Sequence, residues 1–440
     1  MKTIHLVISL LLAATALSAD APYELLLKGG HVLDPKNNLN AVMDVAINDG
    51  KIARVAPAID PIEARQVVDV SGFYVTPGLI DIHVHVYAGT GMRGAYSGDN
   101  SVYPDGHTFR SGVTTVVDVG SSGWRNFEDF KDRVIDRQRT RVLAMLNIVG
   151  HGMGGGAIEQ NNDDMDAKAT ADMAKKHPDT IVGVKTAHYR APDWIAVDRA
   201  VEAGTMADIP VMVDFGSFTA ERPFEELVTK RLRPGDMYTH MYLGSVPMLD
   251  ANGKLRPYLH EARKRGVKFD VGHGGGSFLW KQAIPAIQQG WIPDSISTDL
   301  HITSMNAGMK DMTNVMSKIL SQGVSIYDVV KMSTWHPAQQ IKRPEFGHLS
   351  VGAVADVAVL GIERGDFGFL DVRNGLFKGN QKIVAEMTLQ GGRIAWDLNA
   401  RAAQDWMISY REQQRARGRG RRGAAGAGRG RAGSTIPRRP

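Results

Sequence analysis

The stretch Val75-Thr76-Pro77-Gly78-Leu79-Ile80-Asp81-Ile82-His83-Val84-His85 carries the strongest structural signal in this 440-residue chain. After the Pro77-Gly78 turn, apolar residues dominate a short run, which is typical of a buried strand. His83 and His85 are two residues apart, so on a strand their side chains project to the same face and can bind one metal ion. Two polar residues on an exposed strand would be the other explanation, but the apolar residues that alternate with them favour metal ligands.

Seven further β-branched runs follow, and amphipathic helical stretches separate them. The eight runs are Leu79–His85, Thr114–Asp118, Val142–Ile148, Ile181–Lys185, Val211–Phe215, Met237–His240, Lys268–His273 and Ser295–Asp299. The helical stretches include Phe127–Arg139, Met165–Lys176, Tyr258–Arg265 and Ala283–Gln289. Strands that alternate with helices are typical of parallel βαβ units that close into a barrel. We therefore predict an α/β fold with a TIM-like (β/α)8 barrel over residues 76–345.

Short strands with glycine turns flank this barrel on both sides. They occupy residues 20–75 and resume over residues 346–400, where an Asp49-Gly50 turn in the first flank and a Gly391-Gly392 turn in the second connect neighbouring strands. We predict that the two flanks pack together as one small composite β-sandwich domain. The chain would then leave this domain, build the barrel and return.

The two ends of the chain differ from the body. Residues 1–19 combine Lys2, an apolar stretch and small residues up to Ala19, which predicts a cleaved signal peptide and a periplasmic or secreted protein. An uncleaved anchor is the alternative, but the apolar stretch is shorter than the ~20 residues that span a bilayer. We expect a linker helix over residues 401–410 and a disordered Arg/Gly/Ala-rich tail over residues 411–440.

The tail carries the positive charge of the chain. The net charge is +5, and residues 411–440 contain ten Arg and one Glu, a net +9, which leaves −4 for the rest. No aromatic residues alternate with these arginines, so we expect weak contacts to anionic surfaces and no dedicated nucleic-acid partner. Cysteine is absent, which excludes disulfide scaffolds, thiolate metal sites and cysteine nucleophiles.

Most of the predicted strands end in polar residues. These are His83 and His85 on strand one, Lys185 on four, Asp214 on five, His240 on six, His273 on seven and Asp299 on eight. In such barrels the chemistry occurs at the C-terminal ends of the strands. Packing alone does not explain why apolar strands end so consistently in ligand-type residues, so we predict the functional site there.

The stretch that opens the barrel resembles the start of the amidohydrolase superfamily, and the resemblance extends from about Tyr23 to Trp396. The segments Gly112–Asp118, Asp236–His240, Ser297–His301 and Met332–Ala338 support it. Within the superfamily, the pattern is most similar to the amidohydrolase/deacetylase metallohydrolases, which are related to dihydroorotases. The resemblance implies a hydrolase that uses a metal-activated hydroxide.

The resemblance also implies two divalent metal ions, zinc or alternatively manganese. Lys185 matches the lysine that becomes a carbamate and bridges the ions, although a strand-end lysine paired with an acid is the other explanation. His83, His85, Lys185 and Asp299 would hold one ion, and the carbamate and His240 the second. Asp299 would be the catalytic residue, because it would orient the hydroxide and transfer its proton to the leaving group.

Strand five departs from the family pattern. The family ordinarily supplies a histidine to the second metal at this position, whereas this strand has Asp214. Carboxylate also binds zinc, so we expect Asp214 to replace the histidine and to shift the metal preference toward manganese. The alternatives are an enzyme with one metal ion and a relative that has lost activity.

Two further histidines, His273 and His151, are the predicted substrate contacts. Loop carbonyls could instead satisfy His273, while His151 lies in a glycine-rich loop beyond strand three. His188 and His301 are close in sequence to predicted metal ligands, so either could orient those ligands. We expect cleavage of a non-peptide amide or acetyl ester in a small acylated substrate, and possible homodimers. The alternatives are a cyclic-amide hydrolase, as in dihydroorotase or hydantoinase chemistry, and a non-catalytic scaffold with this fold.

Overall fold

The computed structural model describes residues 21–411, 413 and 414. The described residues up to Asn399 form one compact unit, and those from Ala400 onward form a second, in which residues 406–411 are helical. The predicted signal peptide and nearly all of the predicted tail lie outside the described residues. Within the described part of the chain, no helix is long and apolar enough to cross a membrane.

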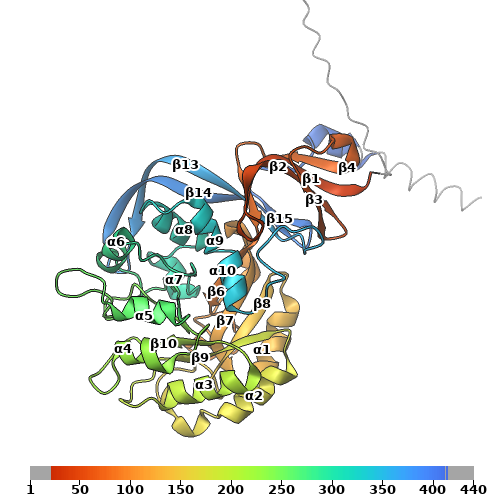
Figure 1. The fold of residues 1–440 in the computed structure, drawn as a ribbon. Helices are drawn as coiled ribbons and strands as arrows, with labels where there is room; N and C mark the ends of the chain where they lie inside the picture. Colours follow the sequence, from red (N-terminus) through yellow and green to blue (C-terminus); the bar gives the residue numbers. More distant parts are fainter. Residues whose placement is uncertain (1–20, 412, 415–440) are drawn as a thin grey trace, which may run out of the picture. The chain divides into compact units, whose positions relative to one another are not determined.

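Seven parallel strands form a curled sheet in which neighbours in sequence are also neighbours in space (Figure 1). They are β6 (Leu79–Val84), β7 (Val113–Gly123), β8 (Arg141–Asn147), β9 (Ile181–Ala187), β10 (Val211–Asp214), β11 (Met237–Tyr238) and β12 (Lys268–Phe269). Parallel neighbours require a crossover connection, which the intervening helices and loops supply. The predicted α/β fold is therefore confirmed, and the first seven predicted runs all contribute strands.

Residues 295–300 join the two edge strands of this sheet. Ser295 forms a parallel bridge with Asp270 beyond β12, and Leu300 forms one with Val84 of β6. The backbone NH of Asp299 also donates to the carbonyl oxygen of His83 at 2.7 Å. The predicted eighth run thus lies between the first and seventh strands, although its bridges are too isolated to make a regular strand. This position brings Asp299 beside His83.

Ten α-helices are assigned among the described residues of the first unit, besides short 3-10 and π-helical turns. They are α1 (Phe127–Arg133), α2 (Ala167–Lys176), α3 (Ile195–Ala207), α4 (Phe224–Glu226), α5 (Tyr258–Lys264), α6 (Trp280–Gln288), α7 (Ile302–Asn306), α8 (Met312–Leu320), α9 (Ile326–Lys331) and α10 (Trp335–Gln340). Asp166 illustrates how such a helix begins, because its carboxylate accepts a hydrogen bond from the NH of Ala169 in the first turn of α2. The first predicted helix is shorter than expected, because Val134 leaves the helical conformation and buries its side chain.

The two flanks of the chain share one separate, mainly antiparallel sheet. Its strands are β1 (Tyr23–Asp34), β2 (Leu39–Asn48), β3 (Lys51–Ala56), β4 (Ala64–Asp69), β5 (Tyr74–Pro77), β13 (Val357–Leu370), β14 (Leu376–Gln390) and β15 (Arg393–Asp397). The flanks meet where β5 pairs with β13, with Val75 opposite Val359. The predicted β-sandwich is not confirmed, because all these strands belong to one sheet and β14 packs against α8 rather than a second sheet.

Gly78 connects the antiparallel sheet to the parallel one. A Cβ at this position would lie 2.2 Å from the Oγ1 of Thr114, so only glycine allows β6 to approach β7 this closely. The NH of Gly78 donates to the carbonyl oxygen of Asp356 at 2.8 Å, and the carboxylate of Asp356 pairs with Arg141 at 2.5 Å. These contacts fix the start of the strand that carries His83 and His85.

Candidate metal centre

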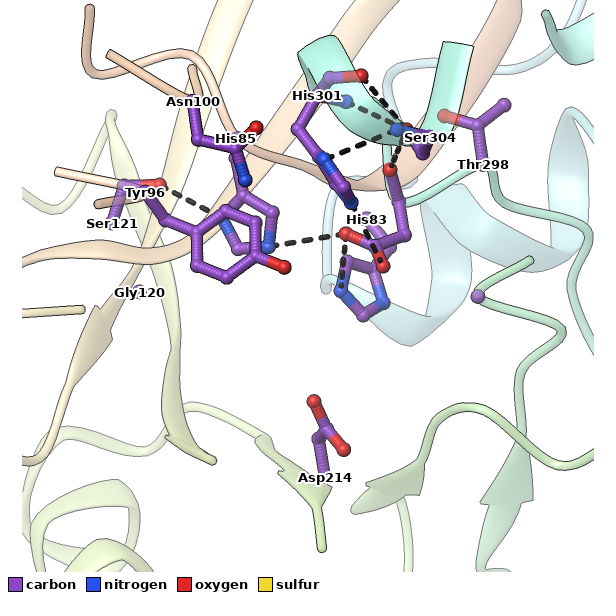
Figure 2. Close-up of polar contacts among 12 residues, drawn as sticks. His83, His85, Tyr96, Asn100, Gly120, Ser121, Asp214, Thr298, His301 and Ser304 are labelled. Carbon is purple, nitrogen blue, oxygen red and sulfur yellow. Dashed lines mark hydrogen bonds and ion pairs between the residues drawn. The ribbon is translucent and has the colours of Figure 1, made fainter. Parts of the chain in front are cut away.

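His83, His85 and Asp299 form a compact buried group at the C-terminal edge of the parallel sheet (Figure 2). The Nε2 of His85 lies 3.2 Å from Asp299 Oδ1, and the Nε2 of His83 lies 3.6 Å from the same oxygen. Among the described residues, this oxygen has no hydrogen-bond partner. Ligand atoms at ~2.0–2.2 Å from a zinc ion are at most ~4.4 Å apart, so these distances suit one shared ion.

The charge states of these three side chains also suit a cation. Burial, together with the charge of Lys185, lowers the pKa of His83 to about 3, so its imidazole is neutral. Burial alone would raise the pKa of Asp299, but the neighbouring His301 holds it well below its usual range. Neutral imidazole and ionised carboxylate are the forms that bind metals.

Hydrogen bonds behind both histidines fix the direction of their rings. Thr239 donates its hydroxyl hydrogen to Asp270 at 2.8 Å, so its oxygen accepts from His83 Nδ1 at 2.8 Å. The proton of His83 is therefore on Nδ1, which leaves Nε2 free toward Asp299. The Nδ1 of His85 lies 2.8 Å from the hydroxyl of Ser121. Such partners typically orient metal-binding histidines.

Lys185 lies in β9 with its amine buried beside the same group. Its side chain is fully buried, and within the described part of the chain its Nζ has no hydrogen-bond partner. Burial lowers the pKa of this amine. A Cβ on Gly120 would lie 2.9 Å from the Lys185 side chain, so glycine is required to admit the lysine. Asp214 Oδ2 lies 3.9 Å from this Nζ, so the two side chains form an ion pair without a hydrogen bond. The alternative interpretation, a strand-end lysine paired with an acid, agrees with these contacts, and a carbamate on Lys185 stays a prediction.

Asp214 and His240 form a second buried pair, and Asp214 points toward the first group from across the site (Figure 2). The Nε2 of His240 lies 3.0 Å from Asp214 Oδ2, and its Nδ1 donates to the carbonyl oxygen of Gly272 at 2.5 Å. Burial would raise the pKa of Asp214, but the charges of His240 and Lys185 hold it far below its usual range. The rings of His83 and His240 are 5.0 Å apart, so the two groups are adjacent.

A cavity of about 330 Å³ opens over both groups. Its walls include the predicted ligands His85, Asp214, His240 and Asp299, together with Tyr96, His188, Gly275, Gly276, Ser277, His301 and Thr303. This volume suits a small molecule. The ring of Tyr96 packs 4.2 Å from the ring of His85, between centroids, and covers that side of the cavity (Figure 2).

The two predicted substrate contacts lie away from this cavity. The Nδ1 of His273 donates to the carbonyl oxygen of Gly274 at 2.9 Å, and its Nε2 lies 2.6 Å from the amine of Lys318. The alternative interpretation, a histidine satisfied within the protein, therefore agrees better with the structure. His151 is exposed on its loop and is not among the residues that line the cavity.

Several site residues had no sequence signal of their own. Glu159 belongs to a short 3-10 turn, yet its buried carboxylate lies 2.6 Å from Nδ1 of His188. Thr239 and Ser121 orient the two histidines of β6 but look like ordinary strand residues. Glu159, Thr239 and Ser121 are distant in sequence from the histidines that they contact, so only the fold brings these pairs together. His301 differs, because the sequence already suggested it as an orienting residue two positions after Asp299. It accepts hydrogen bonds at the start of α7, and its Nε2 lies 3.7 Å from Asp299 Oδ2.

Known proteins are similar to this chain in sequence and in fold. Residues 280–391 match the amidohydrolase family. A deacetylase of Agrobacterium fabrum is 33% identical over 331 residues, which cover 73% of this chain and 79% of that protein. A deacetylase of Brucella anthropi is 30% identical over 369 residues, which cover 80% of this chain and 89% of that protein.

Solved structures of two related enzymes have a similar fold. An adenine deaminase matches with a TM-score of 0.77 and 28% identity, covering 85% of this chain and all of that one. A dihydroorotase matches with a TM-score of 0.72 and 28% identity, covering 84% of this chain and 98% of that one.

Proposed function

Because this chain belongs to the amidohydrolase family and is an enzyme that hydrolyses carbon–nitrogen bonds, we propose that it is a metal-dependent deacetylase of small molecules. The substrate would carry an acyl group on a non-peptide amide or, alternatively, an acetyl ester. The observation that carries this proposal is the pair of buried ligand groups beneath one small cavity. The deacetylase names of the two relatives support the choice of bond.

Two divalent ions, zinc or manganese, fit the residues of this site. His83, His85 and Asp299 would hold one ion, and Asp214 and His240 the other. Lys185 as a carbamate would supply a further oxygen ligand, which agrees with an Nζ that is buried without a hydrogen bond, 3.9 Å from Asp214 Oδ2. When bound, such ions polarise a carbonyl group and lower the pKa of water toward ~7.

Asp299 is suited to move the proton in this reaction. Its pKa is held low, so it is ionised at neutral pH and can accept a proton from the attacking water. The same carboxylate can then give this proton to the leaving amine or alcohol. His301, 3.7 Å from Oδ2, stabilises the ionised form.

Tyr96 and the glycine loop define where the substrate binds. Burial and the nearby charges of Asp299 and Asp214 raise the pKa of Tyr96 far above its usual value, so its hydroxyl stays protonated. It can donate a hydrogen bond to a substrate oxygen while its ring shields His85. Gly275 and Gly276 also line the cavity, with backbone atoms and no bulky side chain.

Two further features belong to the proposal. We take the parallel sheet and the segment 295–300 to be a (β/α)8 barrel. The predicted signal peptide of residues 1–19 would direct the enzyme to the periplasm or outside the cell, where hydrolysis would serve scavenging or detoxification. A cyclic-amide hydrolase is the second candidate, and the structural similarity to a dihydroorotase supports it.

The test is a substrate panel with the purified enzyme loaded with zinc or manganese in the presence of bicarbonate. We expect acetate release from N-acetyl or O-acetyl compounds, abolished by a chelator and by Asp299→Asn. Ring opening of dihydroorotate or hydantoin without acetate release would favour the second candidate. A metal-loaded enzyme that hydrolyses neither class would contradict the proposed function.

A further inference from the structure

We propose that Lys318 is a positioning residue of the proposed reaction, which acts through His273 to hold the loop after β12 against the Asp299 carboxylate. The inference rests on the proposed function, since that function gives Asp299 the proton transfer. Neither Lys318 nor His273 is among the residues that line the cavity. His273, which the sequence suggested as a substrate contact, would therefore act on the site from behind.

The side chain of Lys318 reaches from α8 to three other segments of the chain. It is fully buried, and its Nζ lies 2.6 Å from Nε2 of His273. The same Nζ donates to the carbonyl oxygens of Gly308 and Leu370, each at 2.7 Å. An ammonium group has three hydrogens, and these three acceptors match them. A buried charge is costly unless it is fully hydrogen-bonded, so this amine fits its site only while all three segments stay in place.

Lys318 determines which nitrogen of His273 carries the proton. The Nδ1 of His273 lies 2.9 Å from the carbonyl oxygen of Gly274, and a carbonyl oxygen can only accept, so this nitrogen is the donor. Burial and the charge of Lys318 lower the pKa of His273 well below its usual value, so the ring is neutral and its Nε2 accepts from the amine. The ring also lies parallel to that of Phe278, with centroids 4.6 Å apart. The amine thus selects the tautomer that binds Gly274.

Gly274 transmits this constraint to the proposed catalytic carboxylate. A Cβ on Gly274 would lie 2.4 Å from Asp299 Oδ2, so the backbone of the loop packs directly against this oxygen. The NH of Gly274 donates to the carbonyl oxygen of Thr298 at 2.9 Å, and the NH of His273 donates to that of Ser297 at 3.3 Å. The loop therefore lies along the segment that carries Asp299, and a shift of the loop changes the space around its carboxylate.

The end of β13 is attached to the chain after this loop by contacts that do not involve the lysine. The indole NH of Trp280 donates to the carbonyl oxygen of Phe369 at 3.1 Å, and the NH of Val372 donates to that of Phe278 at 3.1 Å. These bonds remain when the amine is removed. We therefore expect loss of the amine to leave the fold intact and to release chiefly the His273 ring.

Kinetics of the metal-loaded enzyme test the inference, with Lys318→Met as the variant and Ser317→Ala as the matched control. The Ser317 hydroxyl is also buried on α8 and accepts the NH of Ile383 at 2.9 Å, so its loss loosens the packing of α8 while the bond from Lys318 to His273 stays. We expect kcat to fall about 100-fold in Lys318→Met, as for a displacement of ~1 Å, with KM nearly unchanged. In Ser317→Ala, Tm should fall while kcat stays within about twofold of the wild type.

A double-variant cycle tests whether the lysine acts through the histidine. His273→Phe should lower kcat about as much as Lys318→Met, and the combined variant should lower it no further, because residues that act as one unit are not additive. A crystal structure of Lys318→Met adds a readout that needs no substrate. In it, Gly274 should be displaced by about 1 Å relative to Asp299.

Several outcomes would overturn the inference. An unchanged kcat or an unmoved Gly274 in Lys318→Met would show that the lysine only stabilises the fold. Losses that add in the combined variant would show that it does not act through His273. A wild type that hydrolyses neither acetyl compounds nor cyclic amides would instead refute the proposed function, and the position of Gly274 in Lys318→Met would still decide whether the lysine holds the loop.

Discussion

Gly274 lies on the loop after β12 against the Asp299 carboxylate, and replacing it with alanine should disable the proposed site without unfolding the protein. Its φ is +55°, and a Cβ there would lie 2.4 Å from Asp299 Oδ2. An ordinary contact begins at 3.4 Å, so the carboxylate must move by 1.0 Å. A displacement of ~1 Å can cost about 10²-fold in rate. The left-handed backbone should add about 1–2 kcal/mol of destabilisation.

Gly290→Ala is the matched control, at a glycine that does not line the cavity. Its φ of +79° is also left-handed, but a Cβ there would have no heavy atom within 4 Å. We therefore expect kcat/KM for acetate release to fall about 100-fold in Gly274→Ala and to stay within about twofold of the wild type in Gly290→Ala. Denaturant unfolding should show both variants folded at the assay temperature.

Two results would refute this reasoning. An unchanged kcat/KM in Gly274→Ala would mean that the position of the Asp299 carboxylate does not control the rate. Equal losses in Gly274→Ala and Gly290→Ala would mean that left-handed backbone strain, and not the position of the carboxylate, lowers the rate.

Three further predictions follow from the same contacts. Removing the metal ions with a chelator should lower Tm, and adding them back should restore it. An ion that binds only the folded state stabilises that state by about 2.7 kcal/mol at an ion concentration of 100 times its Kd. An unchanged Tm in calorimetry would argue against metal binding. Thr239→Val should weaken metal affinity by about 10–100-fold, since it removes the acceptor for His83 Nδ1, and unchanged affinity in chelator competition would contradict this. Burial lowers the pKa of Lys318 from 10.5 to about 7. Between these values the unfolded chain binds the extra proton, so stability should rise from pH 7 to pH 10. Lys318→Met should flatten that rise in urea unfolding, and an equally steep rise would contradict the assignment.

The sequence predicted the strands because burial leaves a local pattern. Seven of the eight predicted runs became strands of the parallel sheet, and the eighth joins its edges at Ser295 and Leu300. The predicted sandwich was not confirmed, because strand patterns do not reveal what packs against a sheet face. Pairing of β5 with β13 merged the flanks into one sheet, and α8 covers part of β14.

The sequence predicted the site residues that lie at strand ends. It did not predict the contacts that residues of the loops make with them. The predicted ligands lie close together, as expected for residues at the C-terminal ends of strands in one curled sheet. They are His83, His85, Lys185, Asp214, His240 and Asp299. His273 also ends its run, but Lys318, 45 residues further along the chain, binds its free nitrogen. Glu159 and His188 meet through two separate loops, and no sequence periodicity predicts that contact. Roles in metal binding and catalysis stay predictions for all of these residues.

The most direct test of the central claim is the metal content of the wild type and of Lys185→Ala, each grown with zinc and bicarbonate. We predict two equivalents per chain in the wild type, fewer in Lys185→Ala, and acetate release only by the metal-loaded wild type. A wild type without bound metal that still releases acetate would contradict the account, as would a Lys185→Ala variant that keeps both ions.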